Sequence, residues 1–365
     1  MREMGSHDTI RRRWADLLDP HARTIHPLYA ALCATAQGEG PLVNLLLDAP
    51  RAQQRPNLLL AAIHAEVLRD PCSALIPWYP TAQRLHGVDR DDEASLSDGI
   101  VAIVEFCEAA EQRLSAVIRT RSTQTNEVGR SLPLAVGLSL IGRSRGPLAL
   151  IDLGCSGGLN LIPDRYRLEF DGQVYGDPSS PVTIQSIHSG SFPAPTSEPL
   201  DIMYRCGIEA TPLDLDDDDD VIWALACQWP DDVERFERTR AAVNLWREQF
   251  DRPTIITGDL LDRLDDTIDA ISPDLHVVIH HSWVAAYLDY DEQHRLAETI
   301  RRRGAERPLS WLWLEHPKEV PGLSPPRVGS RRIPGSSVLV LENPPGRSKA
   351  LAQVHPHGSW MALEA

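Results

Sequence analysis

The sequence lacks the features that would place it in a membrane or in a secreted, disulfide-rich class. No apolar run approaches the roughly 18 residues that span a bilayer, and no apolar segment follows the arginines at residues 11–13. The six cysteines form no Cys-x-x-Cys pair, which is typical of buried free thiols in a reducing compartment. We therefore expect a cytoplasmic protein with no transmembrane segment and no metal centre.

Basic residues are scarce relative to acidic ones. The chain has 36 Lys and Arg against 52 Asp and Glu, a formal net charge of -16. A general nucleic-acid binder normally carries a basic patch. The charge balance therefore argues against nucleic acid and leaves a small molecule as the expected partner. The sequence does not predict an oligomeric state.

Two kinds of pattern divide the 365 residues. Residues 8 to about 120 carry apolar side chains at three- and four-residue spacing, which predicts an all-helical domain at residues 1–122. From about residue 148, short apolar runs alternate with helical patterns, which predicts an α/β domain at residues 123–365 whose parallel sheet is covered on both faces. The last runs, SVLVLEN and GSWMALEA, are expected to pair antiparallel at the sheet edge. A Gly-, Pro- and Ser-rich excursion is expected at about 171–200, opened by a hairpin.

The stretch LALIDLGCSGGLNL (148–161) contains the strongest single motif, an apolar run that ends in an acid and breaks into glycines. The residues expected to hold a ligand there are Asp152, Gly154, Ser156, Gly157 and Gly158. Glycines let the backbone approach a ligand, and a helix start would offer free N–H groups, with Asn160 one turn into that helix. Ser156 replaces a frequent glycine, so we expect a negative φ there and Gly157 in any strained position. A nucleotide or nucleoside is the expected ligand.

Further polar side chains follow the other predicted strands. They are Glu209 in CGIEATP, Asp259 in TGDLLD, His280 and His281 in IHHSW, and Glu315 and His316 in LEHP. The carboxyl ends of parallel strands meet at one edge of the sheet, where ligands bind. The Glu209 carboxylate can hold the two hydroxyls of a ribose. Glu169 or Asp171, at the spacing of a simpler dinucleotide fold, is its rival.

Candidates for the substrate side include two adjacent histidines. Neighbouring residues on a strand face opposite ways, so at most one of His280 and His281 is expected in the pocket, where a neutral imidazole can take a proton near pH 7. Tyr166, Trp283 and Trp311 are candidates for the cavity wall, through cation–π contact with a cationic ligand. Core packing is the alternative for each of the three.

The order of glycine loop, GIE, GD, HHS and closing antiparallel strands resembles a class I S-adenosylmethionine-dependent methyltransferase. That resemblance implies a Rossmann-like, doubly wound, mostly parallel sheet of seven strands. The chain from about residue 124 also resembles an uncharacterised bacterial family with a methyltransferase-like C-terminal half. The pieces that carry this are QTNEVGRS, DLGCSGGLNL, RYRLEFDGQVYGDPSSPV, CGIEATPLD, QWPDD, HHSWVAAYLD and HPHGSW. The helical first third matches less distinctly.

The resemblance implies S-adenosylmethionine as cofactor and S-adenosylhomocysteine as product. It assigns the ribose to Glu209 and the adenine to Asp259 and the neighbouring Leu260. The segment before the first strand reaches the amino-acid end of the cofactor in this fold, which implies roles for Arg130 on its carboxylate and for Asn126 and Glu127 on its amine or on the substrate. A helix cap with a surface salt bridge is the alternative for that segment. Asn160 and Ser282 complete the expected site.

The leading prediction is a methyltransferase acting on a small molecule. S-adenosylmethionine is already activated, so the protein needs mainly to align a nucleophile and exclude water. The second hypothesis is attack on the aminocarboxypropyl arm, by transfer or ring closure, with release of methylthioadenosine. A nicotinamide oxidoreductase is disfavoured by the missing G-x-G-x-x-G spacing, and a non-catalytic binding protein stays open. The helical domain is expected to be a lid or a substrate platform.

Overall fold

The computed structural model describes residues 2–17, 26–36, 38, 40–88, 95–170, 172–190, 200–327 and 332–363. The chain divides into two compact units. Unit 1 comprises Met1–Thr125 and Asp216–Arg240, and unit 2 comprises Asn126–Leu215 and Ala241–Ala365. The N-terminal helices therefore pack together with a segment from the second half of the sequence, which the sequence analysis assigned to the other domain.

Unit 1 is built from helices. They are α1 (Arg2–Asp16), α2 (Pro27–Thr35), α3 (Pro41–Asn44), α4 (Pro56–Arg69), α5 (Pro80–His86), α6 (Leu96–Ala109), α7 (Glu111–Thr120), α9 (Asp218–Ala226) and the first turns of α10 (Val233–Glu248). Proline is the first residue of α2, α3, α4 and α5, where its fixed φ suits the first turn and its missing N–H is not needed. The central helix α4 is buried around most of its circumference and contacts α5, α7 and α9. The described residues that precede unit 2 contain no strand.

His64 on α4 links this helix to two other parts of unit 1. Its Nδ1 lies 3.2 Å from the carbonyl oxygen of Ala226, so Nδ1 carries the proton and Nε2 accepts from the Thr81 hydroxyl at 2.8 Å. Burial lowers the pKa of His64 from 6.5 to about 4. The imidazole is therefore neutral in the folded protein at pH 7.

Acidification is expected to destabilise the protein through His64. The unfolded chain binds a proton at this position before the folded chain does, so the free energy of unfolding falls as the pH drops from about 6.5 to about 4, by about 3 kcal/mol over the whole window. His64→Gln should remove this component, and urea denaturation at pH 7 and pH 5 measures it. The matched control is His294→Gln, at an exposed position of unit 2. Equal pH dependence in the wild type and His64→Gln would contradict the assignment.

Unit 2 is organised around a nine-stranded sheet in the order β5-β12-β11-β10-β9-β8-β1-β6-β7. Five strands run parallel to one another, namely β1 (Leu148–Leu153), β6 (Ile202–Glu209), β7 (Thr254–Thr257), β8 (His276–Ser282) and β9 (Leu309–Glu315). The others are β10 (Ser337–Glu342), β11 (Lys349–Val354), β12 (Trp360–Leu363) and β5 (Ile187–Ser189). The protein thus has a mixed α/β architecture with a large, mostly parallel sheet, and this sheet has nine strands where seven were expected.

The pairing of the last strands in the sequence differs from the prediction. SVLVLEN forms β10 and GSWMALEA contains β12, but these strands do not pair with each other. Strand β11, with the sequence KALAQV, lies between them and pairs antiparallel with both. Five of its six residues are buried, so it lacks the polar alternation by which an edge strand is recognised in a sequence.

The excursion at 171–200 adds β5 to the large sheet and also helps to form a small one. The small sheet has the order β3-β2-β4, from β2 (Arg167–Phe170), β3 (Gln173–Gly176) and β4 (Thr183–Gln185). The antiparallel pairing of β2 with β3 confirms the predicted hairpin. Asp171 and residues 191–199 lie outside the described residues.

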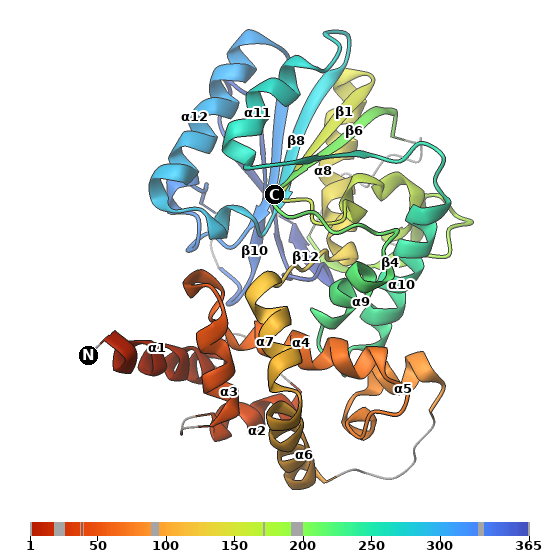
Figure 1. Cartoon of the computed structure of the whole chain (residues 1–365). Coiled ribbons are helices and arrows are strands. Elements are labelled where there is room, and N and C mark those ends of the chain that lie inside the picture. The colour runs from red at the N-terminus through yellow and green to blue at the C-terminus, as the bar shows by residue number, and fades with distance from the viewer. Residues whose placement is uncertain are drawn as a thin grey trace. The chain divides into compact units, whose positions relative to one another are not determined.

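Helices cover the two faces of the large sheet. On one face α8 (Ser131–Arg145) packs so closely on β9 that a Cβ added to Gly137 would overlap the side chain of Leu312. On the other face α11 (Leu260–Asp269) and α12 (Tyr290–Glu306) lie side by side (Figure 1). Residues such as Ile279, Trp313 and Ile300 form the core beneath them. The parallel strands are thus covered by helices on both faces of the sheet.

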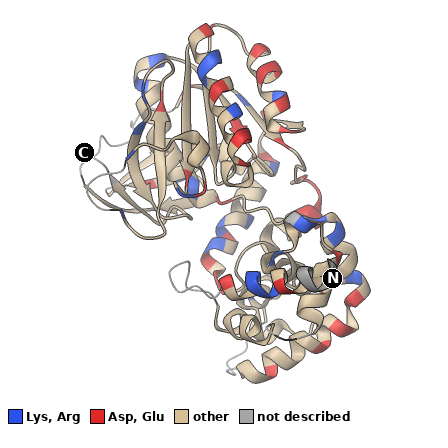
Figure 2. Cartoon of the chain, turned by 90° about the vertical axis from the view of Figure 1, so that its left-hand side faces the viewer, with Lys and Arg blue, Asp and Glu red and all other residues tan. Residues whose placement is uncertain are grey.

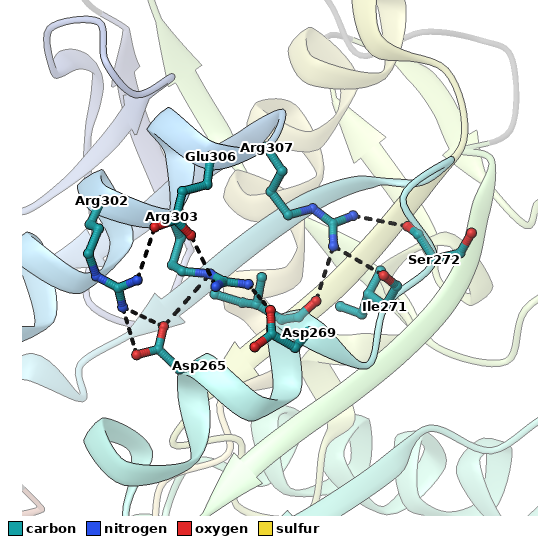
Figure 3. A network of polar contacts seen from close by, with 9 residues as sticks. Asp265, Asp269, Ile271, Ser272, Arg302, Arg303, Glu306 and Arg307 are labelled. Atoms are coloured by element: carbon teal, nitrogen blue, oxygen red, sulfur yellow. Dashed lines mark hydrogen bonds and ion pairs between the residues drawn. The ribbon is translucent and has the colours of Figure 1, made fainter.

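A polar network fixes α12 to α11 (Figure 3). Arg302 contacts both carboxylate oxygens of Asp265 at 2.7 Å, and Arg303 pairs with Asp269. Arg307 donates to the backbone carbonyls of Ile268, Ile271, Ser272 and Leu275. Exposed ion pairs contribute little, about 0.2–1 kcal/mol each. Arg307 contributes differently, because one guanidinium satisfies a carbonyl in the last turn of α11 and three carbonyls of the connection that follows it.

Candidate functional site

The strand order of the large sheet reverses between β1 and β8. Strands β6 and β7 follow outward on one side of β1, and β9 follows on the other side of β8. Ligands of open parallel sheets bind outside the carboxyl ends of the strands at such a reversal. The structure places the loop 154–158, Glu209 and Ser282 there, at the ends of β1, β6 and β8. The strand-end residues predicted to form the site therefore share one edge of the sheet.

The loop after β1 does not lead into the predicted helix. Two short 3-10 turns, Leu159–Leu161 and Pro163–Arg165, connect it directly to β2. Pro163 has no N–H and its ring would collide with the preceding turn of a longer helix. Asn160 consequently lies in a 3-10 turn, and the loop has no helix N-terminus to attract an anion.

Ser156 adopts the conformation that the sequence analysis assigned to Gly157. Its φ is +53°, whereas the expectation was a negative φ. The residue is buried, and its N–H donates to Oε2 of Glu209 at 3.0 Å. A non-glycine residue in this region is strained, and such strain persists only where the surroundings enforce it. Gly157 serves packing instead, because a Cβ there would lie 2.7 Å from the side chain of Leu215.

Glu209 lies beside this loop at the end of β6. Besides the Ser156 N–H, it accepts the N–H of Thr211 at 3.2 Å through Oε1. A carboxylate has about four acceptor positions, so these two bonds leave it capacity for further donors. Its rival Glu169 lies in the small sheet, bonded to Arg167 at 2.8 Å and to Gln185. Only Glu209 of these two acids is therefore at the edge where the strand order reverses.

Asp152 and His280 face each other across β1 and β8. His280 Nδ1 lies 3.5 Å from Oδ1 of Asp152, and both side chains are buried. Burial raises the pKa of Asp152 well above its ordinary value, the charge of Glu209 raises it further, and Arg130 opposes the shift. Burial, together with His281, lowers the pKa of His280 to about 3. His280 is thus a neutral imidazole, and neither of its ring nitrogens has a hydrogen-bond partner among the described residues.

His281 points to the opposite face, which confirms that the two histidines diverge. Its Nδ1 lies 2.8 Å from Oε1 of Glu315, and both side chains are fully buried. The same Glu315 oxygen accepts the N–H groups of Val284 and Ala285 at 2.9 and 3.0 Å. The His281 ring lies parallel to that of Trp313 at 6.4 Å. His281 is therefore part of the core under α12, away from Asp152.

Arg130 connects the end of β8 to the C-terminal turn at residues 355–358. Its Nε donates to the carbonyl of Pro356 at 2.8 Å, and its Nη1 donates to the carbonyl of Ser282 at 3.1 Å. The guanidinium also lies 5.9 Å from the ring of Trp283. The resemblance predicts that Arg130 holds a cofactor carboxylate, whereas its Nε bonds to a carbonyl 226 residues away in the sequence.

Glu127 and the C-terminal turn form a second link at the same place. Glu127 accepts the N–H of Gly129 through Oε1 at 2.9 Å, and its Oε2 lies 3.2 Å from Nδ1 of His357. A Cβ on Gly129 would overlap the carbonyl oxygen of His357, so the two backbones are in direct contact. His357 was not among the predicted site residues, although it lies in the motif HPHG, and the structure places it beside Glu127.

Several predicted site residues make hydrogen bonds or packing contacts with other residues of the protein. The Tyr166 hydroxyl donates to the carbonyl of Leu159 at 2.7 Å, and burial raises its pKa. Asn160 accepts from the Ser131 hydroxyl at 2.8 Å. Asp259 caps α11 by accepting the N–H of Leu261 at 2.8 Å, and Leu260 packs partly buried against the core. Trp311 is fully buried in that core.

The bends at the carboxyl ends of β1 and β8 are both strained. Among the described residues, the non-glycine residues with positive φ are Ser156, Trp283 and Ser324. Two of the three flank the point at which the strand order reverses. Strained backbone concentrates at functional sites, which marks this edge independently of its acids.

Comparison with known proteins places the chain in a family. A family model described as "Uncharacterized protein conserved in bacteria (DUF2332)" matches residues 14–362. The chain belongs to the DUF2332 family. The match extends over parts of both units, so the helical unit belongs to the DUF2332 sequence pattern as much as the sheet does. No curated protein matches the sequence.

The charges of this DUF2332 protein are mixed in sign along its helices (Figure 2). No helix of the described residues is long and apolar enough to cross a membrane. Within the same residues, no group of three His, Cys, Asp or Glu side chains is arranged to hold a metal ion. The acidic run at 214–220 leads into the first turn of α9, where the N-cap residue Asp217 accepts the N–H groups of Asp219 and Asp220.

Proposed function

We propose that this protein is an S-adenosylmethionine-dependent transferase that methylates a small molecule in the cytoplasm. The observation that carries the proposal is the Glu209 carboxylate, held at the end of β6 by the N–H of Ser156 from the loop after β1. An acid in this place, one strand along from a glycine loop, binds ribose hydroxyls in nucleoside-binding α/β folds. The free acceptor positions of Glu209 suit the two hydroxyls of a ribose.

The arrangement of the parallel strands supports the same proposal. Numbered along the chain, β1, β6, β7, β8 and β9 stand in the order 3-2-1-4-5, which is the Rossmann-like doubly wound pattern. The antiparallel β10, β11 and β12 add to the β9 side in chain order. The interpretation of the large sheet as a Rossmann-like fold therefore rests on its five parallel strands.

S-adenosylmethionine supplies a methyl group already activated on a sulfonium. Glu209 would hold its ribose, and the negative charge of Glu209 complements the positive sulfur. Neither ring nitrogen of the neutral His280 has a hydrogen-bond partner among the described residues, so the imidazole can accept a hydrogen bond from a substrate nucleophile. The remaining requirement is alignment of the two reactants away from water.

Calorimetry on the full chain with S-adenosylmethionine and S-adenosylhomocysteine tests the proposal. We expect both to bind, and Glu209→Gln to weaken binding at least ~30-fold, since a charged acceptor of the ribose is lost. The matched control is Glu169→Gln, which alters an acid of the small sheet and should leave affinity unchanged. Absence of binding to the wild type, or equal effects of the two substitutions, would overturn the proposal.

Product analysis separates methyl transfer from attack on the aminocarboxypropyl arm. Incubation with S-adenosylmethionine and candidate acceptors should yield S-adenosylhomocysteine, identified by its mass. Methylthioadenosine in its place would assign arm chemistry to the same site. Binding without either product would leave the protein a non-catalytic cofactor binder.

A further inference from the structure

Three consecutive N–H groups of the loop after β1 converge on one side chain of unit 2. The N–H groups of Gly157, Gly158 and Leu159 lie 3.1, 3.2 and 3.3 Å from one atom of the Asn126 amide. Three donors require an acceptor, so this atom is the amide oxygen. The carbonyl of Cys155, 3.3 Å from the same atom, would favour the amide nitrogen, but a single acceptor does not outweigh three donors.

The neighbouring donors of the loop are also engaged within the chain. The Ser156 N–H donates to Glu209, and the Gly158 N–H additionally donates to the carbonyl of Cys155 at 2.7 Å. The backbone N–H groups from residue 156 to residue 159 therefore all have acceptors in the folded protein. In dinucleotide-binding folds the corresponding groups hold the pyrophosphate of the ligand.

We infer that Asn126 is a specificity-determining residue that closes the loop to phosphate groups, so the site takes a nucleoside without phosphates. The inference rests on the proposed function, because it defines the ligand class of the same site. Its amide oxygen occupies the position that a phosphate oxygen would need. The Glu209 carboxylate, which accepts the N–H of Ser156 in the loop, adds a like charge that repels a phosphate.

A neutral amide suits this role better than a charged group. It satisfies the N–H groups without adding charge, so the loop can lie next to a nucleoside whose own charge is positive or zero. A phosphate could enter only by displacing an oxygen that already accepts three hydrogen bonds. The same contacts hold the segment that continues through Glu127 to Arg130.

Substitution of Asn126 tests the role of its oxygen without any nucleoside. Asn126→Ala removes the acceptor and should give the protein a melting temperature that rises with inorganic phosphate, compared with chloride at equal ionic strength. Asn126→Asp is the matched control, because it retains an oxygen in the same place and should show no response, like the wild type. A phosphate response in the wild type, or none in Asn126→Ala, would overturn the inference.

A ligand panel on the wild type separates failure of the inference from failure of the proposed function. Calorimetry should show adenosine and S-adenosylhomocysteine binding at least 100-fold more tightly than ADP or ADP-ribose. Equal affinity for the phosphorylated ligands would overturn the inference while leaving a nucleoside site in place. If none of the four binds, the proposed function fails, and the phosphate response of Asn126→Ala still decides whether the loop is closed to phosphate.

Discussion

Replacing Glu315 by alanine is expected to lower the free energy of unfolding by about 4 kcal/mol. Removing one member of a buried, hydrogen-bonded pair typically costs about 3–5 kcal/mol, because the partner stays buried without compensation. Here the loss would leave His281 and the N–H groups of Val284 and Ala285 without their shared acceptor. Urea denaturation at pH 7 measures the change.

Two further variants make the Glu315 experiment specific. Glu315→Gln retains an acceptor oxygen but loses the charge, so it should cost less than alanine, by about half. Glu298→Ala alters an exposed acid of α12 and should change the free energy of unfolding by less than about 0.5 kcal/mol. A loss below about 1 kcal/mol for Glu315→Ala would show that the pair does not hold the turn after β8.

Gly358→Ala is expected to lower the free energy of unfolding by about 3 kcal/mol or more. Gly358 has a φ of +77°, and a Cβ there would overlap the carbonyl oxygen of Gly129. The substitution therefore combines backbone strain with a collision that only movement of the C-terminal turn can relieve. Thermal and urea denaturation of the full chain measure the loss.

Gly87→Ala is the matched control for the collision. Gly87 is left-handed, with a φ of +65° and a ψ of +30°, but a Cβ there would meet nothing within 4 Å. The substitution should cost only the left-handed backbone conformation, about 1–2 kcal/mol. The difference between the two variants isolates the contact between the turn at 355–358 and the segment that contains Arg130. Equal losses would mean that this contact relaxes without cost.

The strand ends of the candidate site could be predicted because each follows a short apolar run. That pattern located Asp152, Glu209 and Ser282 at one edge of the sheet, and two-residue periodicity predicted the divergence of His280 from His281. The path of the chain after β1 could not be predicted in the same way. Pro163 prevents a helix from continuing after the glycine loop. The sequence predicted the hairpin, but it did not show that the hairpin follows the loop without a helix between them.

Contacts between distant segments were the least predictable part of the site. Arg130 contacts Pro356 because α8, which begins directly after Arg130, packs on the sheet that contains the C-terminal strands. No periodicity in the sequence predicts such a contact. Asn126 was expected to contact a ligand, whereas its amide oxygen accepts hydrogen bonds from the backbone of the glycine loop. Strand β11 escaped recognition because burial on both faces removes polar alternation.

The division of unit 1 into two stretches of sequence has a consequence during synthesis. The ribosome releases the N-terminal helices first, then β1 and β6, and only later α9, which packs against α4. Until residues up to 240 have emerged, the apolar side of α4 that α9 will cover is open to water, to other chains and to chaperones. Unit 1 can therefore complete its fold only after residues 216–240 have been synthesised, although its N-terminal helices are made first.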